Sequence, residues 1–444
     1  MTNPAPAPTA NITKADQRQA YLKSLSQSAK AALPAELALP ELRAKADALV
    51  NEQTFPSTRE EDWRFTDLSP MLAIDFAAVT DSASVAADEL PSVRLEESKG
   101  AQVVLANGRF DAGLSQLDAL PEGAVVGSLQ SLYGEHQAKL DERLAQSSGG
   151  HEVFTALNTV GFQDAVVVWL PKNAVVETPI QIIYLSKPGD SPLMAQPRAL
   201  VIAETGSVAT VIEDFWGAED GDHFTNTVSE FFVDANAQIT HLRVQREGAG
   251  TFHIGKTAVT QGRDSHYAST AVSFGARLSR HNWEVYQTGE QTATKLYGLG
   301  AIADSQHNDT HSLVALNHPH GTVDQLHKCI VDNKAHCVFS GRMAVAQKAQ
   351  LTSASQLNRN LLLSDKARVD TKPQLEIVAD NVKCAHGATV SQLEADEIFY
   401  LQSRGINAAQ AQRLLIYAFA MEILDTMTVP SLRSALTEAI SRWT

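Results

Sequence analysis

The chain has 444 residues, of which 44% are hydrophobic and 20% charged, and its formal net charge is −15 at pH 7. This length exceeds what one ordinary hydrophobic core organises, so we expect several domains or a repetitive architecture. The acidic balance argues against binding to nucleic acid or to an anionic membrane surface. Only three cysteines occur and no apolar run approaches the roughly 18 residues of a membrane span, so a cytoplasmic protein is expected.

The N-terminal part, residues 1–160, is expected to be mainly helical or mixed. Residues 1–14 begin with alternating Pro and Ala and lack the apolar segment of a signal peptide, so they are expected to be a disordered lead-in. Residues 15–52 are rich in Ala, Leu, Lys, Gln and Glu, which predicts short helices. The pair Asn107-Gly108 predicts a hairpin turn, and residues 133–144 predict a helix.

Residues 161–390 have a different pattern, because β-branched residues and short apolar-polar alternations recur with few helical stretches. Turn-like positions recur at intervals of roughly 26 to 32 residues. They lie at Gly206, Asn236, Gly262, Gly289, Gly321 and Lys348. Such a period predicts a parallel β-helix, in which each coil buries the apolar face of its neighbour. One or two β-sandwiches are the alternative.

Residues 391–444 are expected to be helical again. Asn407 is a candidate N-cap for a helix from Ala408 to about Met427. An apolar stripe runs along this helix at four-residue spacing and consists of Leu415, Phe419, Ile423 and Met427. The stripe can pack on the protein's own core or dock a partner, and the pattern alone leaves both open.

One segment, Gly250-Thr-Phe-His-Ile-Gly-Lys256-Thr257, matches the P-loop pattern G-x-x-x-x-G-K-[ST]. A P-loop needs a helix after it, because the helix N-terminus and the loop amides hold the phosphates. Here a β-branched stretch that is broken by Gly262 follows Thr257. We therefore expect a turn between strands at this segment and assign no nucleotide site to it.

A histidine-rich stretch between residues 307 and 337 is a candidate metal site. It contains His307, His311, His318, His320, His327, Cys329, His336 and Cys337. The spacing matches no compact ligand motif, and most histidines in such a stretch lie on the surface or are satisfied in the core. A metal-binding β-helix enzyme that uses this stretch is kept as an alternative function.

The sharper candidate is Cys384 with His386. In an extended strand residues i and i+2 point to the same side, so the thiol and the imidazole would face one surface together. Both are iron ligands, and the neighbouring Lys383 would favour the thiolate. A Cys/His nucleophilic dyad is disfavoured, because side chains i and i+2 stand too far apart for direct proton exchange. On spacing alone, a coincidence of two ordinary strand residues remains open.

Three stretches resemble the SufB/SufD family of the SUF iron-sulfur cluster assembly machinery. Residues 382–390 with 399–406 resemble the family's C-terminal signature, and Pro56–Thr66 resembles its N-terminal signature. Residues 252–265 resemble a central coil of its core. The segment His386-Gly-Ala-Thr-Val390, with Cys384 retained, resembles the SufD branch more than the SufB branch. A SufB-like paralogue that acts as the primary cluster scaffold is the alternative.

The resemblance implies a right-handed parallel β-helix with helical terminal regions. It also implies a non-catalytic scaffold that pairs with SufB through the β-helix and docks the SufC ATPase through its C-terminal helices. The resemblance thereby favours docking of SufC by the stripe of Leu415, Phe419, Ile423 and Met427. A nascent iron-sulfur cluster would form at the SufB-SufD interface, with Cys384 and His386 there and His386 preferred as the ligand. ATP with Mg²⁺ would be bound by SufC and not by this chain.

Several properties are left open by the sequence and by the resemblance. They are the cluster type, the sulfur donor, the presence of reduced flavin in the complex, and a homodimer of the isolated chain. A purely structural adaptor, which only holds ATPase subunits, is a third functional hypothesis.

Overall fold

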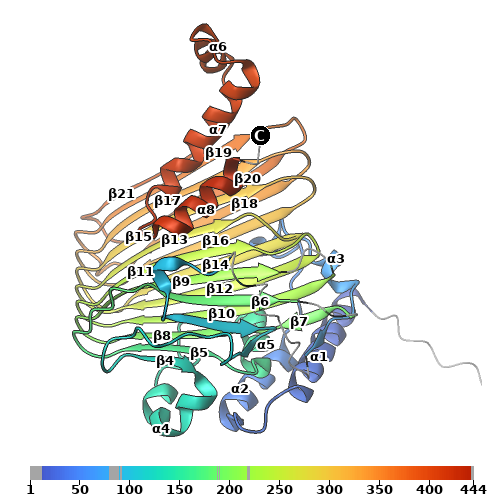
Figure 1. Ribbon diagram of the computed structural model, residues 1–444, viewed down its shortest axis with the longest axis vertical. Coiled ribbons are helices and arrows are strands. Elements are labelled where there is room, and N and C mark those ends of the chain that lie inside the picture. Colours follow the sequence, from blue (N-terminus) through green and yellow to red (C-terminus); the bar gives the residue numbers. More distant parts are fainter. Residues whose placement is uncertain are drawn as a thin grey trace, which may run out of the picture.

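The computed structural model describes residues 13–79, 90, 93–187, 189, 191–217 and 221–441. Its centre is a parallel β-solenoid whose coils stack along the longest axis of the molecule (Figure 1). Helical elements flank the solenoid at both ends of the sequence. The predicted fold class, a parallel β-helix with helical terminal regions, is therefore confirmed.

Two sheets form the walls of the solenoid. The first contains β4 (Val125–Ser128), β5 (Val166–Leu170), β8 (Arg198–Ala203), β10 (His223–Val233), β12 (Thr251–Gln261), β14 (Leu278–Gln287), β16 (His307–Leu316), β18 (His336–Val345) and β20 (Arg368–Ile377). Strand β7 (Leu193–Ala195) also pairs with β10, and β1 (Ala77–Ala78) pairs with β7. The second contains β3 (Arg109–Phe110), β2 (Gln102–Ala106), β6 (Ile180–Ser186), β9 (Val208–Gly217), β11 (Gln238–Arg246), β13 (His266–Ser273), β15 (Ala293–Ile302), β17 (Thr322–Val331), β19 (Ser353–Leu362) and β21 (Lys383–Gln392). Consecutive coils pair in parallel from β5 and β6 onward.

One corner repeats in each coil, where the chain passes from the first sheet to the second. The residues there with left-handed backbone are Gly206, Asn236, Asp264, Gln291, His320 and Leu351, with φ between 57° and 76°. The six turn positions predicted from the sequence lie at or close to these residues. A corner of this kind favours Gly, Asn and Asp, because other side chains pay a steric cost at positive φ.

The interior of the solenoid is filled by alternate residues of each strand. In the first sheet Phe231, Val259, Val285, Val314 and Met343 are Cα partners in successive coils. All five are buried in one continuous apolar cluster. Each coil thus covers the apolar residues of the coil before it, which is the physical reason that a chain of this length needs no single oversized core.

The N-terminal helices pack against the early coils (Figure 1). They are α1 (Lys14–Ala31), α2 (Pro40–Glu52), η1 (Glu61–Trp63), α3 (Ser69–Leu72), η3 (Glu96–Ser98), α4 (Leu129–Asp141) and α5 (Val153–Gly161). The expected lead-in over residues 1–14 falls mostly outside the described residues. Its last two residues are ordered, since Thr13 caps α1 and Lys14 begins it.

Two local predictions in this region are confirmed. The hairpin turn at Asn107-Gly108 joins β2 to β3, and both residues have positive φ, at 52° and 84°. The predicted helix over residues 133–144 corresponds to α4, which begins earlier, because Ser128 accepts a hydrogen bond from the backbone N–H of Ser131 as the N-cap. Local turn and cap chemistry therefore set these two features.

The C-terminal helices are α6 (Ala395–Ser403), α7 (Ala408–Leu424) and α8 (Pro430–Ser441). Asn407 caps α7 as predicted, because its Oδ1 accepts a hydrogen bond from the Gln410 N–H at 2.9 Å. Helices α7 and α8 pack on the outer face of the second sheet, whereas α6 lies beyond the last coils (Figure 1). Among the residues described, no helix combines the length and apolar character needed to cross a membrane.

Truncating Ile423, a fully buried side chain of α7, is expected to loosen the C-terminal helices. The variant Ile423→Ala should lower the free energy of opening of α7 and α8 by about 2–5 kcal/mol, because a cavity replaces part of the contact with the sheet. Hydrogen exchange of the α7 and α8 amides measures this change. The control is Leu414→Ala on the exposed side of α7, and an equal effect of both variants would contradict the packing described.

Candidate functional site

Cys384 and His386 lie on β21, the last strand of the second sheet. In the register, Cys384 pairs with Ala354 and His386 pairs with Gln356 on β19. Ala354 and Gln356 are buried residues, so their partners on β21 continue the columns of side chains that fill the solenoid. Cys384 is half-buried against the central apolar cluster, and His386 is exposed. The structure therefore brings the two side chains to the open end of the solenoid interior.

A polar layer lies directly beneath His386. The Gln356 side-chain N–H donates to Gln325 Oε1 at 2.8 Å, and the Gln325 N–H donates to Ser312 Oγ at 2.7 Å. Gln356 Oε1 is buried and has no hydrogen-bond partner among the described residues. The imidazole of His386 thus stands over an amide layer that still has one acceptor free.

Burial raises the pKa of the Cys384 thiol, and a hydrogen bond with the Ala354 backbone opposes this only in part. The prediction that Lys383 favours the thiolate is wrong for this chain alone. Lys383 is the neighbouring residue on an extended strand, so its side chain points to the opposite face. The free chain therefore holds Cys384 as a thiol at neutral pH.

The open end presents the free edges of both sheets. Strand β20 pairs only with β18, and β21 pairs only with β19, among the residues described. Three apolar side chains around this end are exposed, namely Ile377, Val378 and Val390, and Val378 is 64% exposed. Unpaired strand edges with apolar side chains are templates for pairing with another chain.

The histidine-rich stretch does not converge on one centre. His307 and His336 have rings 4.8 Å apart, but Nε2 of His336 contacts Asp370 at 2.7 Å and Nε2 of His307 contacts Thr66 at 2.9 Å. Nε2 of His311 lies 3.1 Å from Asp309. Within the described part of the chain, no group of three or more His, Cys, Asp or Glu residues is arranged to hold a metal ion.

The remaining members of the stretch lie elsewhere. His320 forms a corner with φ of 61°, and His318 precedes it in the same turn. His327 faces the interior and stacks on Phe339 at 4.7 Å. Cys329 and Cys337 are buried together, with 2.8 Å between their sulfur atoms.

A buried polar network inside the early coils was not predicted. Glu213 accepts hydrogen bonds from Tyr184 at 2.7 Å and Ser229 at 2.6 Å, and its other oxygen lies 3.0 Å from Nε2 of His241. Burial alone would raise the pKa of Glu213, but these three partners hold it below its usual value. The sequence signal that could have predicted this network is the presence of polar residues at strand positions whose side chains alternate into the interior. The network satisfies its own groups and lies several coils away from β21.

The apolar stripe of α7 packs on the solenoid. Ile423 is 0% and Met427 3% exposed, and both belong to the cluster between the helices and the second sheet. Phe419 is partly buried, with its carbonyl accepting a hydrogen bond from Lys328 Nζ at 2.8 Å. Leu415 is also only partly exposed. The prediction that the stripe docks a partner is therefore corrected for Ile423 and Met427, which are buried within the chain, whereas Leu415 and Phe419 keep part of their surface exposed.

A different set of apolar side chains is exposed on the C-terminal helices. It comprises Phe399 and Tyr400 of α6 and Leu414 and Tyr417 of α7. The periodicity of the sequence did not predict this set, because α7 is apolar on more than one side. Apolar residues at four-residue spacing therefore do not show which side of the helix faces outward.

The segment that matches the P-loop pattern is a strand. Residues 251–261 form β12 without a break, which also corrects the expected turn there. Lys256 Nζ donates to the Gly149 carbonyl at 2.7 Å and pairs with Glu284 at 2.8 Å. The residues directly after this lysine continue as β12 and form no helix, so the segment lacks the helix N-terminal amides that hold phosphates in a P-loop.

Known proteins match this architecture along nearly the whole chain. Residues 185–419 match the family described as SUF system FeS cluster assembly, SufBD core domain, and residues 16–182 match the SufBD protein N-terminal region. An iron-sulfur cluster assembly SufBD family protein of Synechocystis is 44% identical over 95% of this chain and 94% of its own length. The iron-sulfur cluster assembly protein SufD of Escherichia coli is 31% identical over 87% of this chain and 89% of its own.

A more distant relative covers even more of the sequence. The iron-sulfur cluster assembly protein SufD of Bacillus subtilis is 27% identical over 97% of this chain and 98% of its own length. The extent of these matches agrees with the three resembling stretches and with the β-solenoid. The chain belongs to the SufB/SufD family of iron-sulfur cluster assembly proteins.

Proposed function

We propose that this chain is a SufD-like, non-catalytic scaffold subunit of a cytoplasmic SUF complex. It pairs through the open end of its solenoid with a SufB-type partner, and a nascent iron-sulfur cluster is assembled between them. The observation that carries this proposal is the position of Cys384 and His386 at that open end. The SufB-like role of primary scaffold remains the second candidate, because the two paralogues belong to one family.

The two side chains supply only part of a cluster site. An iron-sulfur cluster is usually held by four ligands, so two residues on one strand leave the rest to a partner. His386 is the better ligand in the free chain, because it is exposed and a neutral imidazole needs no ionisation to bind iron. Cys384 must lose its proton first, and burial makes that loss harder. The nascent cluster is cargo that leaves the site, and not a resident cofactor.

The partner is held by the edges of both sheets. Pairing of β20 or β21 with a second solenoid would satisfy the free edges and cover Val378 and Val390. A homodimer of the isolated chain would use the same edges, since they lie on one end of the molecule. In this proposal, assembly with a partner and formation of the cluster site coincide, because both use the same end of the solenoid.

The ATPase partner, SufC, docks on the exposed apolar side chains of α6 and α7 in this proposal. It binds ATP and Mg²⁺, and this chain binds neither. Helix α7 is tied to the second sheet by Glu422, which pairs with Lys328 on β17 and with Arg359 on β19. Because β19 is the strand that pairs with β21 among the described residues, movement of the ATPase would have a short path to Cys384 and His386. Reduced flavin, where a SUF complex uses it, is assigned to the complex and not to a site on this chain.

Removing the imidazole at position 386 tests the ligand role. In a complex co-expressed with its SUF partners, His386→Ala should lower iron and acid-labile sulfide by at least about tenfold, because a metal ligand is lost. The complex should keep its composition on size-exclusion chromatography, since an exposed side chain does not stabilise the fold. The control is His266→Ala, another exposed histidine at the start of β13. Full cluster content in an intact His386→Ala complex would favour the purely structural adaptor.

Charging the exposed face of the C-terminal helices tests the docking surface. The double variant Leu414→Asp and Tyr417→Asp should weaken capture of the ATPase by at least about tenfold, because carboxylates would be buried in an apolar contact. Co-purification of the ATPase with the tagged chain measures the loss. Val175→Asp, at an equally exposed valine between β5 and β6, is the matched control. Equal recovery of the ATPase with both proteins would place docking elsewhere.

A further inference from the structure

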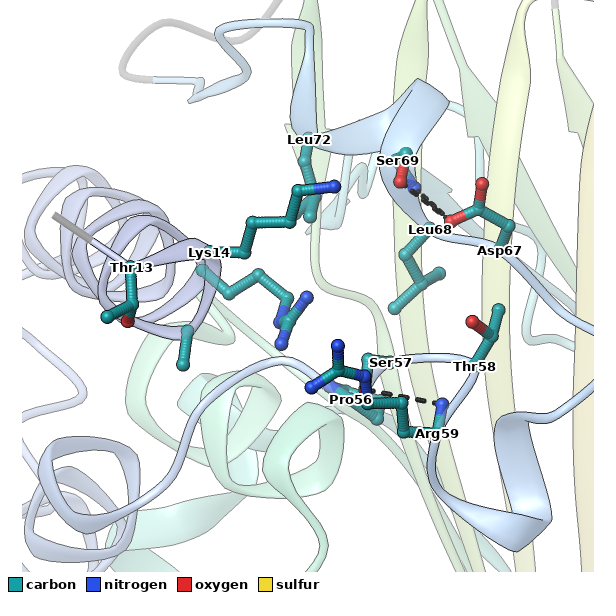
Figure 2. A pocket seen from close by; sticks show the side chains of 12 residues that line it. Thr13, Lys14, Pro56, Ser57, Thr58, Arg59, Asp67, Leu68, Ser69 and Leu72 are labelled. Atoms are coloured by element: carbon teal, nitrogen blue, oxygen red, sulfur yellow. Dashed lines mark hydrogen bonds between the residues drawn. The ribbon is translucent and has the colours of Figure 1, made fainter.

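The N-terminal signature segment, Pro56–Thr66, has no role in the proposed function. Its first residues and the start of α1 enclose a cavity of about 540 Å³ (Figure 2). Residues 67–72, which lead into α3, close another side of it. The volume is in the range of small-molecule sites, which is roughly 300–1,000 Å³.

Three cationic side chains line this cavity, namely Lys14 and Arg18 of α1 and Arg59 of the signature segment. Figure 2 shows the side chains of Lys14 and Arg59 reaching into the hollow. None of the three side chains makes an ion pair or a hydrogen bond with another described residue. The Nε of Arg18 is buried and has no partner in the described part of the chain.

The nearby carboxylates do not neutralise these charges. Asp67 lines the cavity, but its Oδ1 accepts hydrogen bonds from the Ser69 N–H at 3.0 Å and the Ser69 hydroxyl at 2.7 Å. Asp16 is bound to Thr13, whose N–H and hydroxyl donate to it at 2.8 and 2.7 Å. Three like charges around one hollow, with one carboxylate among them, leave a surplus of positive potential that an anion would relieve.

The other groups of the cavity suit a phosphate group. Helix α1 has 18 residues and begins at Lys14, so its N-terminus adds a positive partial charge beside the three cations. The hydroxyls of Ser57 and Thr58 supply further donors. Guanidinium groups bind phosphate oxygens in a two-pronged geometry, which favours phosphate over a compact ion such as chloride. No aromatic side chain lines the cavity, so it offers no surface on which a base would stack.

We infer that this cavity is a binding site for a phosphate group, carried by a small phosphorylated molecule or by free phosphate. The site contains no residue of β20 or β21, so it does not depend on the proposed cluster chemistry.

Calorimetric titration of the full chain with inorganic phosphate and with ribose 5-phosphate, at constant ionic strength, tests the site. We expect saturable binding of one equivalent. Tighter binding of inorganic phosphate would indicate free phosphate as the ligand, and tighter binding of ribose 5-phosphate would indicate a phosphorylated molecule. Arg59→Gln and Arg18→Gln should each weaken binding by at least about tenfold, because each removes a charged hydrogen bond. Lys14→Gln is a third variant, at an exposed position where folding is not at risk.

The matched control is Lys23→Gln, an exposed lysine on the same helix but outside the cavity. It should bind both probes as the unmodified chain does. Absence of saturable binding to the unmodified chain would overturn the inference. So would equal binding by the control and by all three cavity variants, because the phosphate would then be held elsewhere.

A second, independent observation concerns Cys329 and Cys337. Both are fully buried, they lie on β17 and β18 across one corner, and their sulfur atoms are 2.8 Å apart. This is closer than the optimal contact of about 3.5–4.0 Å between non-bonded carbon atoms, although sulfur is the larger atom. Burial alone would raise the pKa of Cys329, but Cys337 and the neighbouring His327 lower it to about 6. Formation of a disulfide would shorten this separation of 2.8 Å to about 2.05 Å.

We propose that a peroxide converts this thiol pair to a disulfide. The Cys329 thiolate attacks one peroxide oxygen, which breaks the O–O bond, forms a sulfenic acid and releases hydroxide that is protonated to water. The Cys337 sulfur then displaces the sulfenic hydroxyl, which leaves as a second water when the S–S bond forms. Two thiols are oxidised, one peroxide is reduced, and the two thiol protons end in the two waters.

Peptide mass spectrometry after treatment of the full chain with hydrogen peroxide and alkylation tests this pairing. Tryptic cleavage after Lys328, Lys334 and Arg342 should leave residues 329–334 linked to residues 335–342, and dithiothreitol should separate them. Cys384→Ser should form the same link, whereas Cys337→Ser should leave Cys329 unlinked. The proposal fails if Cys329 and Cys337 remain reduced while Cys384 is oxidised, or if the link joins Cys384 instead.

Discussion

The stacking of one coil on the next, in parallel and in register, is the constraint on which the rest of this structure depends. Each inward-facing residue is covered by its partner in the following coil, as Ala354 is covered by Cys384 and Gln356 by His386. The same rule leaves the last coil uncovered, because no strand follows β20 and β21 in their sheets among the described residues. Residues that would be buried core in any earlier coil therefore become accessible at this end. The position of the candidate site follows from the architecture as much as from the chemistry of the two side chains.

The C-terminal helices pack on the second sheet, the same sheet that ends with Cys384 and His386 on β21. Burial of Ile423 and Met427 fixes α7 to the second sheet, and the side chain of Lys328 reaches the Phe419 carbonyl and Glu422. Lys328 is nearly fully buried at its own strand, and among the described residues its ammonium finds its partners on α7. The helix is thus an integral layer of the solenoid wall, and its exposed side remains for other contacts. Helix α7 therefore has a packing side, with Ile423 buried, and an exposed side, with Leu414 and Tyr417.

Periodicity predicted the solenoid well because the period is imposed by geometry that every coil shares. Left-handed corners such as Asn236 and Asp264 need particular residue types, so they leave a trace in the sequence. The sequence around Lys256 is compatible with a loop or with a strand, and only the pairing of β12 with β10 distinguishes the two. The raised pKa of the Cys384 thiol and the cationic cavity at Lys14 and Arg59 could not be predicted. Both arise where segments that are distant in sequence come together. Pairings of this kind carry no local signature.

The uncovered last coil changes the surroundings of His386. A strand in the middle of the solenoid would place its imidazole between two coils, where each ring nitrogen could be satisfied inside the protein, as His241 is by Glu213 and Tyr267. On the last strand the neighbouring coil is missing, and the layer beneath offers the unpartnered oxygen of Gln356. An imidazole in that setting has a free nitrogen directed away from its own chain or toward a partner. The open coil therefore leaves His386 exposed, as the proposed shared cluster site requires.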